Sequence, residues 1–261
     1  MEVSLNGKKA LVGGSSKGIG LAVAKQLAAS GASVCLMARD ESKMKEIIKN
    51  LPSEKGQVHC FLQVDFSDFS SFKLKLEVFF KENKIDILVN NTQGPPSGNS
   101  LSKSIQDYQT SFDLLFKNIV YTTSLAMKNM KSQGWGRIIN IASISVREPL
   151  NYLVLSNTMR AAVVTWGKSL SYDVAQYGIT VNSILTGYFD TERITQLNSA
   201  KAKSMNISES QVLSAMKEMV PLNRLGKPEE YGYLVSFLAS NKAAYITGTS
   251  IPIDGGLLKS T

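Results

Sequence analysis

Residues 8–20, KKALVGGSSKGIG, join a short apolar run to a glycine-rich turn, and this stretch determines the predicted fold. The turn follows a predicted strand and opens a predicted helix that begins at about Ile19. Gly14, Gly18 and Gly20 permit a tight turn and a close backbone approach, while the start of the helix directs free N–H groups at a diphosphate. This context favours a dinucleotide-binding turn over a loop without a ligand.

Further apolar runs rich in Val, Ile and Leu follow, and they are typical of buried parallel strands. With the first run, they cover residues 8–13, 32–38, 57–64, 85–90, 136–143 and 179–185. Amphipathic stretches that can cross between strands lie near residues 18–30, 41–50, 68–82, 106–131 and 152–176. Strands that alternate with helices predict an α/β fold: a Rossmann-type, doubly wound parallel sheet with three αβα layers, forming a single domain over residues 1–261.

Residues 187–222 interrupt this alternation. They open irregularly with GYFDTE and continue with two polar, Met-containing stretches of helical pattern. An insertion beyond the carboxyl end of a strand commonly covers the ligand crevice of such a sheet. We therefore predict a lid over the substrate in this segment.

The formal net charge of +8 raises the hypothesis of a nucleic-acid or membrane partner. The lysines, however, are spread along predicted helices and mixed with Glu, which is typical of solvated faces. No apolar run approaches the roughly 18 residues that cross a bilayer, and the N-terminus has no secretion signal. Cys35 and Cys60 lie in apolar stretches and predict buried thiols rather than disulfides or a metal site. We expect a cytoplasmic protein that binds a small-molecule substrate and neither nucleic acid, membrane nor metal.

The charge near the expected adenosine ribose favours NADP(H) over NAD(H). The second predicted strand ends at Arg39, where an acidic residue would accept hydrogen bonds from a free 2′-hydroxyl. Arg39 and Lys17 would instead surround a 2′-phosphate with positive charge, unless both are ordinary surface cations. Ser16 and Ile19, in the glycine-rich turn, are also expected to contact the cofactor.

Together these motifs resemble the short-chain dehydrogenase/reductase family, especially its 3-oxoacyl-ACP reductase-like members, over nearly the entire chain. In VDFSD, Asp65 occupies the position that contacts adenine in the family, and VNNTQG places Asn90 and Asn91 where the family steadies the sheet and the cofactor. RLGKPEE, FLAS and ITGTSIPIDGG match the C-terminal signature of the family. The resemblance implies a homotetramer or dimer built on the helices near 106–131 and 152–176 and on the C-terminal strand region.

The same resemblance shows a departure at the catalytic positions. In the family, a Tyr transfers the substrate proton, a Lys one helical turn later lowers the pKa of that Tyr, and a Ser about thirteen residues earlier binds the carbonyl. Ser143 matches the serine, whereas Ser156 and Arg160 occupy the tyrosine and lysine positions. Leu115 occupies the position of the asparagine that completes the relay. A serine is a poorer acid than a phenol, whose reference pKa is about 10, and a guanidinium stays charged.

Two tyrosines offer substitutes for the missing proton donor, and one threonine matches a cofactor-binding position. Tyr152, Ser156 and Arg160 recur at a spacing that shares one helix face, so Tyr152 either reaches the substrate or packs at the helix start. Tyr188, at the start of the predicted lid, is a further candidate. Thr191, in FDTE, matches a threonine that bonds the nicotinamide carboxamide in the family.

These observations leave three hypotheses open. The first is an NADP(H)-dependent oxidoreductase acting on a carbonyl or alcohol group, with Ser143 and Ser156 orienting the oxygen and Arg160 holding the nicotinamide ribose. The second is an NADP(H)-binding protein without dehydrogenase activity, either a sensor or an inactive paralogue. The third is a lyase or dehalogenase resembling the halohydrin-processing branch of the family, against which the intact glycine-rich turn, Arg39 and Asp65 argue.

Overall fold

The structure, a computed structural model, describes residues 2–260 and builds them around a seven-stranded parallel sheet with the order β3-β2-β1-β4-β5-β6-β7. The strands are β1 (Lys9–Gly13), β2 (Ser33–Ala38), β3 (Cys60–Gln63), β4 (Ile87–Asn90), β5 (Gly136–Ile141), β6 (Ile179–Thr186) and β7 (Ser250–Ile253). The strand order reverses between β1 and β4, and ligands of doubly wound sheets bind at the carboxyl ends of the strands at such a point.

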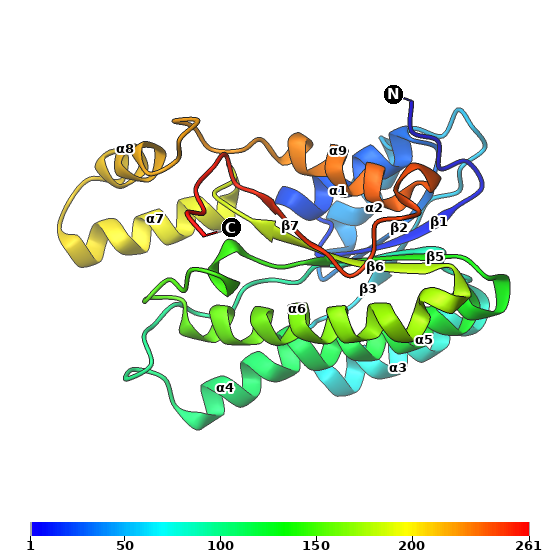
Figure 1. Cartoon of the computed structure of the whole chain (residues 1–261), viewed down its shortest axis with the longest axis horizontal. Coiled ribbons are helices and arrows are strands. Elements are labelled where there is room, and N and C mark those ends of the chain that lie inside the picture. The colour runs from blue at the N-terminus through cyan, green and yellow to red at the C-terminus, as the bar shows by residue number, and fades with distance from the viewer. Residues whose placement is uncertain (1, 261) are drawn as a thin grey trace.

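Helices cover both faces of the sheet (Figure 1). One layer contains α1 (Gly18–Ala29), α2 (Glu41–Lys49) and α9 (Pro228–Ala239), and the other contains α3 (Phe69–Glu82), α4 (Ile105–Phe112), α5 (Asn118–Gln133) and α6 (Val154–Val174). A separate apolar cluster fills each interface; Val23 and Tyr231 belong to the first, Phe72 and Met159 to the second. The predicted Rossmann-type, three-layer fold is thereby confirmed.

All six predicted strands are present, five with shorter bounds and β6 one residue longer, and β7 adds an edge strand that the apolar runs did not predict. Strand β3 begins at Cys60 rather than at 57 because backbone groups before Cys60 and at the edge of β2 form hydrogen bonds with side chains instead of with each other. The N–H of Val58 donates to Ser33 Oγ, and His59 joins the N–H of Val34 to Pro52 O. Cys60 lies opposite Cys35 in the register of β2 and β3, and both are free thiols.

The helix predicted over 106–131 is divided. Between α4 and α5 the chain forms a π-helical turn, Asp113–Lys117, in which each turn holds an extra residue. Leu115, the residue at the relay asparagine position, lies buried inside this turn. The insertion shifts the register of α5 relative to α4, so the two helices do not present one continuous face.

The segment 187–222 contains two helices, α7 (Glu192–Met205) and α8 (Glu209–Glu218), as its pattern predicts. Figure 1 shows both beside the carboxyl ends of the strands, outside the two helix layers. That position is compatible with the predicted lid, which remains a prediction.

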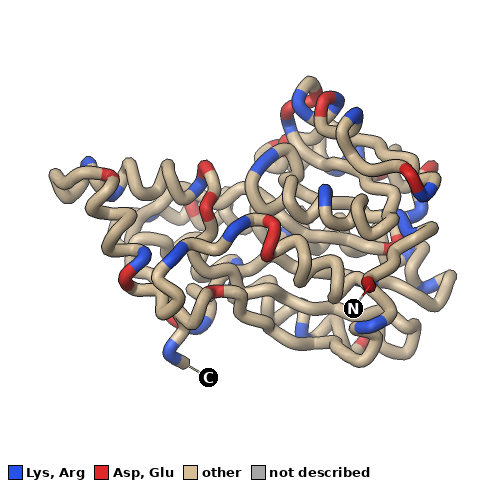
Figure 2. Tube along the Cα trace, turned by 90° about the horizontal axis from the view of Figure 1, so that it is seen from above, with Lys and Arg blue, Asp and Glu red and all other residues tan. Residues whose placement is uncertain are grey.

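Charged residues of both signs are interspersed along the chain, as Figure 2 shows. The excess of lysine and arginine therefore does not gather over one element. Among residues 2–260, no helix is both long enough and apolar enough to cross a bilayer.

Candidate cofactor and active site

The glycine-rich turn between β1 and α1 has the backbone conformation that its sequence predicts. Gly14 and Gly18 have φ of 55° and 54°, in the left-handed region that favours glycine. A Cβ on Gly20 would lie 2.3 Å from Gly14 O, so this position excludes any side chain. Asn91 Nδ2 donates to Gly13 O at 2.9 Å and ties the turn to the end of β4.

The first turn of α1 is open to an anion. Its N-cap residue, Lys17, has extended backbone and no side-chain cap bond, and the first turn holds no acidic residue. The leading N–H groups of a helix have no partner within the helix, and here no side chain caps them. Ser15 is buried and its Oγ accepts from Met37 N, which fixes the turn against β2, whereas Ser16 and Ile19 stay partly exposed.

Arg39 and Asp65 lie where the adenosine end of a dinucleotide is expected. Arg39 is exposed at the end of β2. Hydrogen bonds from Ser67, together with the charge of Arg39, hold the pKa of Asp65 below its usual range. Lys17 Nζ forms an exposed ion pair with Glu192 of α7 at 2.6 Å, and its role at the 2′-phosphate stays a prediction.

A buried hydrogen-bond chain supports the floor of the site. Asn90, at the end of β4, donates to Thr123 Oγ1 of α5 and to Asn140 Oδ1 of β5, at 3.0 and 2.9 Å. All three residues are almost fully inaccessible to solvent. These hydrogen bonds fix the ends of β4 and β5 against the helix layer that contains α5.

Ser143, Ser156 and Arg160 converge near the carboxyl end of β5. Ser143 follows β5, and its Oγ accepts from Ser145 N at 3.1 Å. On α6, Arg160 Nε donates to Ser156 Oγ at 3.2 Å, and Arg160 Nη1 donates to Ile141 O. Burial lowers the pKa of Arg160, and the charge of Arg193 lowers it further. Both serine hydroxyls accept a hydrogen bond here and keep their own protons free to donate.

Tyr152 lies outside α6, so the prediction that it shares a helix face with Ser156 and Arg160 is wrong. Helix α6 begins at Val154, because Leu153 forms a bridge with Gly98 and the two residues before Leu153 form a turn. In that bridge Gly98 N donates to Tyr152 O.

The Tyr152 side chain instead meets Tyr188, the first side chain after Gly187. Burial and the neighbouring Tyr152 hydroxyl raise the pKa of Tyr188 to about 12. Burial also raises the pKa of Tyr152. Both phenols are therefore protonated at neutral pH and available as hydrogen-bond donors.

Thr191 brings the start of α7 against the glycine-rich turn. A Cβ built on Gly18 would lie 3.5 Å from Thr191 Cγ2, which is ordinary contact. With the ion pair between Lys17 and Glu192, this contact places residues 191 and 192 beside the expected diphosphate position.

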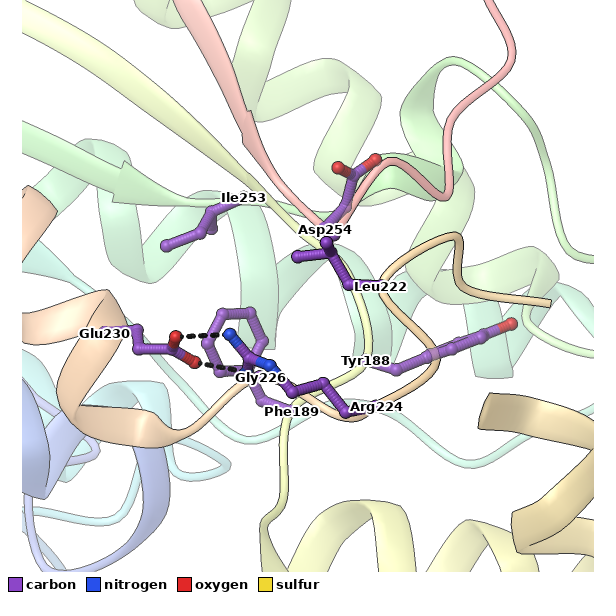
Figure 3. Close-up of a pocket in the computed structure, with 9 residues that line it drawn as sticks. Tyr188, Phe189, Leu222, Arg224, Gly226, Glu230, Ile253 and Asp254 are labelled. Carbon is purple, nitrogen blue, oxygen red and sulfur yellow. Dashed lines mark hydrogen bonds and ion pairs between the residues drawn. The ribbon is translucent and has the colours of Figure 1, made fainter. Parts of the chain in front are cut away.

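A cavity of about 190 Å³ lies at the ends of β6 and β7 (Figure 3). Its lining comes from the ends of β6 and β7 and from the loop that leads into α9, and the side chain of Tyr188 points away from the other lining residues. Its charged groups are already satisfied: Arg224 makes a two-pronged ion pair with Glu230 at 2.7 and 2.8 Å, and Asp254 accepts from backbone N–H groups. We therefore assign the site to the crevice at the ends of β1, β4 and β5.

Comparisons with known proteins agree with this geometry. A family model described as enoyl-(acyl carrier protein) reductase matches residues 14–258. The chain is 30% identical over 258 residues to the 3-oxoacyl-(acyl-carrier-protein) reductase FabG of Aquifex aeolicus, covering 98% of this chain and 100% of that protein. The chain belongs to the short-chain dehydrogenase/reductase family. It is also 34% identical to the oxidoreductase UcpA of Salmonella typhimurium over 256 residues, 97% of this chain and 95% of that protein.

Solved structures of this family share the fold. L-sorbose reductase of Gluconobacter frateurii, crystallised with NADPH and L-sorbose, superposes with a TM-score of 0.92 at 29% identity, covering 100% of each chain. The likeness to short-chain dehydrogenase/reductases therefore includes the layers, the sheet and the region around α7 and α8.

Sequence reasoning missed Arg193 of α7. Its Nη2 donates to Pro95 O in the loop after β4, at 2.9 Å, and lies 3.2 Å from a Cβ built on Gly94. A signal was present in the sequence, because a cation in the first turn of a helix is opposed by the helix dipole and requires another reason. The buried pair of Thr186 and Tyr231, whose hydroxyls lie 3.0 Å apart beneath the site, was also missed.

Proposed function

We propose that the chain is an NADP(H)-dependent oxidoreductase that acts on a carbonyl or alcohol group. The observation that carries this proposal is the uncapped start of α1 beside a turn that cannot hold a Cβ at Gly20. Such a cradle suits the close approach of a diphosphate to backbone N–H groups. The NADPH and L-sorbose in the superposed reductase support the same assignment.

The residues of the crevice fit the parts of this cofactor in order. Gly14, Ser16, Gly18 and Ile19 would hold the diphosphate, with Gly20 keeping the approach open. At one end, Arg39 would contact the 2′-phosphate and Asp65 the adenine; at the other, Asn91, Thr191 and Arg160 would hold the nicotinamide half. When bound, the cofactor supplies or accepts the hydride.

The protein groups act on the substrate oxygen. Ser143 and Ser156 each accept a hydrogen bond from the protein, so each hydroxyl proton stays available for donation to a substrate oxygen. Two such donors stabilise negative charge that develops on a carbonyl oxygen. Arg160 holds Ser156 in place and adds a fixed positive charge, because a guanidinium does not deprotonate at physiological pH. The proton itself comes from solvent, or from Tyr152 or Tyr188 where one of them reaches the oxygen.

Thermal stabilisation by NADPH and NADH, measured side by side, is the first test. A ligand at a hundredfold its dissociation constant stabilises the folded state by about 2.7 kcal/mol. We expect stabilisation by NADPH at lower concentration than by NADH, followed by NADPH oxidation with a ketone, an aldehyde or a β-ketoacyl thioester. Stabilisation by neither coenzyme refutes the proposal.

A second candidate is an NADP(H)-binding protein without dehydrogenase chemistry. Ser156 and Arg160 favour this candidate, because they replace the tyrosine that usually donates the proton and the lysine that lowers the pKa of that tyrosine. Leu115, in the π-helical turn, replaces the relay asparagine and favours it as well. The double variant Ser156→Tyr with Arg160→Lys separates the two. Reductase activity that appears only in this variant supports the second candidate, whereas activity in the natural chain supports the first.

We also propose a cytoplasmic homodimer or homotetramer that assembles through the layer formed by α4, α5 and α6. Exposed apolar side chains on this layer, Ile105, Phe112 and Tyr172, support the choice of surface. Light scattering on the eluting protein tests it, and a monomeric mass at micromolar concentration refutes it.

A further inference from the structure

Arg193 occupies the first turn of α7, and its guanidinium reaches across to the loop after β4. The side chain has solvent on one side, while its Nη2 donates to Pro95 O at 2.9 Å. Gly94 leaves room for the guanidinium, since a Cβ there would lie 3.2 Å from Nη2. The dipole of α7 opposes a cation at this position. What favours arginine here therefore lies in the crevice rather than in the helix.

Arg160 presents a second guanidinium to the same crevice. Its partners are Ile141 O and Ser156 Oγ, and the only protein partner of the Arg193 guanidinium among residues 2–260 is Pro95 O. Both cations thus contact neutral oxygens. The ion pairs in the described part of the chain use other cations, namely Lys17, Lys45, Lys73, Lys117 and Arg224. Burial lowers the pKa of both arginines, and the two charges repel each other.

Two neighbouring guanidiniums become costly when a bound substrate displaces the water that solvates them, unless an anion arrives with it. Their planar donor forks match a carboxylate, which accepts two parallel hydrogen bonds from one arginine. The crevice therefore has the charge and geometry to select an anionic ligand.

The anion in question is distinct from the cofactor diphosphate. The diphosphate position lies at the start of α1, where Gly18 meets Thr191. Arg193 reaches in another direction, to the fourth residue after Asn91, and Arg160 reaches Ile141, two residues before Ser143. The two guanidiniums thus lie toward the carboxyl ends of β4 and β5, at the reacting end of the crevice.

We propose that Arg193 binds a carboxylate of the substrate next to the positive charge of Arg160, and that the substrate is a short oxo acid whose carbonyl oxygen lies at Ser143 and Ser156. This inference rests on the proposed oxidoreductase function. In the reduction, the carbonyl carbon accepts a hydride from NADPH and the carbonyl oxygen takes one proton from solvent. The products are a hydroxy acid and NADP⁺, and the carboxylate is unchanged.

The test compares acids with neutral ketones in which a methyl group or a hydrogen replaces the carboxylate. The pairs are 2-oxohexanoate with 2-hexanone and 3-oxohexanoate with 2-pentanone. Each is titrated by calorimetry into the NADPH-loaded protein and assayed for NADPH oxidation, using wild type, Arg193→Gln, Arg193→Lys and Lys203→Gln. Lys203→Gln is the matched control, because it removes one positive charge from an exposed position on the same helix.

We expect at least one acid to bind tenfold or more tightly than its ketone. Arg193→Gln lowers this preference at least tenfold, Arg193→Lys recovers part of it, and Lys203→Gln retains it, while the dissociation constant of NADPH changes less than twofold in all of them. Equal binding of acid and ketone, or no binding of either acid, overturns the inference. Weaker NADPH binding in Arg193→Gln with an unchanged acid preference also overturns it, because the arginine then serves the cofactor.

These outcomes separate the inference from the function on which it rests. Acid binding that depends on Arg193, without turnover, supports the carboxylate site and refutes the oxidoreductase. Turnover of the neutral ketones without preference for the acids supports the oxidoreductase and refutes the carboxylate site.

Discussion

Replacing Gly20 by alanine tests the cradle on which the cofactor assignment depends. Helix propensity alone predicts that alanine stabilises a helix by about 1 kcal/mol relative to glycine. The structure predicts the opposite, because the new Cβ would lie 2.3 Å from Gly14 O and 2.8 Å from Asn91 Nδ2. Ordinary contact begins at 3.4 Å, so the Gly14 carbonyl has to retreat by about 1 Å.

The expected magnitude follows from these two opposing effects. Overpacking in a rigid site costs about 1–3 kcal/mol, and part of it is offset by the helix propensity of alanine. A net loss of about 1–2 kcal/mol lowers the melting temperature of a chain of this size by about 2–8 °C. The moved turn also misdirects its N–H groups, and losing one hydrogen bond to a charged phosphate weakens NADPH binding about 10- to 100-fold.

The assay is NADPH titration by calorimetry, with differential scanning calorimetry on the same samples. Gly134→Ala is the control: its φ of 68° strains alanine, but no atom lies within 4 Å of the new Cβ. This control loses about 1 kcal/mol of stability and keeps its NADPH affinity. Wild-type NADPH affinity in Gly20→Ala would show that the glycine-rich turn accommodates the new Cβ without losing its NADPH contacts. This result would refute the claim that a close approach of backbone and diphosphate requires glycine at position 20.

Three further perturbations have definite expected results. Arg39→Ala weakens NADPH binding about 10- to 100-fold and leaves NADH binding unchanged in fluorescence titrations, and an equal loss for both coenzymes contradicts the placement of the 2′-phosphate. Arg224 holds the pKa of Glu230 at about 2, below its unfolded value, so the pair stabilises the fold above about pH 4.5 and this contribution disappears as the pH falls toward 2. Glu230→Gln therefore lowers the free energy of unfolding by no more than about 1 kcal/mol at pH 7, since the pair is exposed. In urea unfolding, the difference in this free energy between variant and wild type has to be smaller at pH 3 than at pH 7. Asn90→Ala leaves Asn140 Oδ1 without its donor and costs about 1–3 kcal/mol in the same assay, and a loss below about 0.5 kcal/mol would mean that water replaces the bond.

Much of the fold was predictable because its signals are local. Each buried parallel strand is a short apolar run. The turn after β1 is recognisable by its glycines, and the structure confirms that Gly14 and Gly18 have positive φ angles. The apolar runs did not include strand β7, although the resemblance implied a C-terminal strand region. Strand β7 is short, lies at the sheet edge and contains Pro252, and proline weakens the strand pattern and is tolerated at edges.

The site was harder to predict because its contacts join distant segments. Spacing placed Tyr152 on the helix face of Ser156, but a backbone bridge to Gly98, invisible in local periodicity, keeps Tyr152 outside the helix. The hydrogen bond from Arg193 spans 98 positions to Pro95, and no window of sequence shows it. Ser156 and Arg160, one helical turn apart, were placed correctly together because that contact is local.

Two of the polar contacts at the start of α7 respond differently to the salt concentration. The ion pair between Lys17 and Glu192 is exposed, with more than half of each side chain open to water, so dissolved salt weakens it; the Debye length falls to about 3 Å in 1 M salt. The hydrogen bond from Arg193 to a backbone carbonyl is far less sensitive to ionic strength. Concentrated salt would therefore weaken the ion pair that holds α7 to the glycine-rich turn. The hydrogen bond from Arg193 would keep the start of α7 attached beside β4, and the helix could rotate about that point.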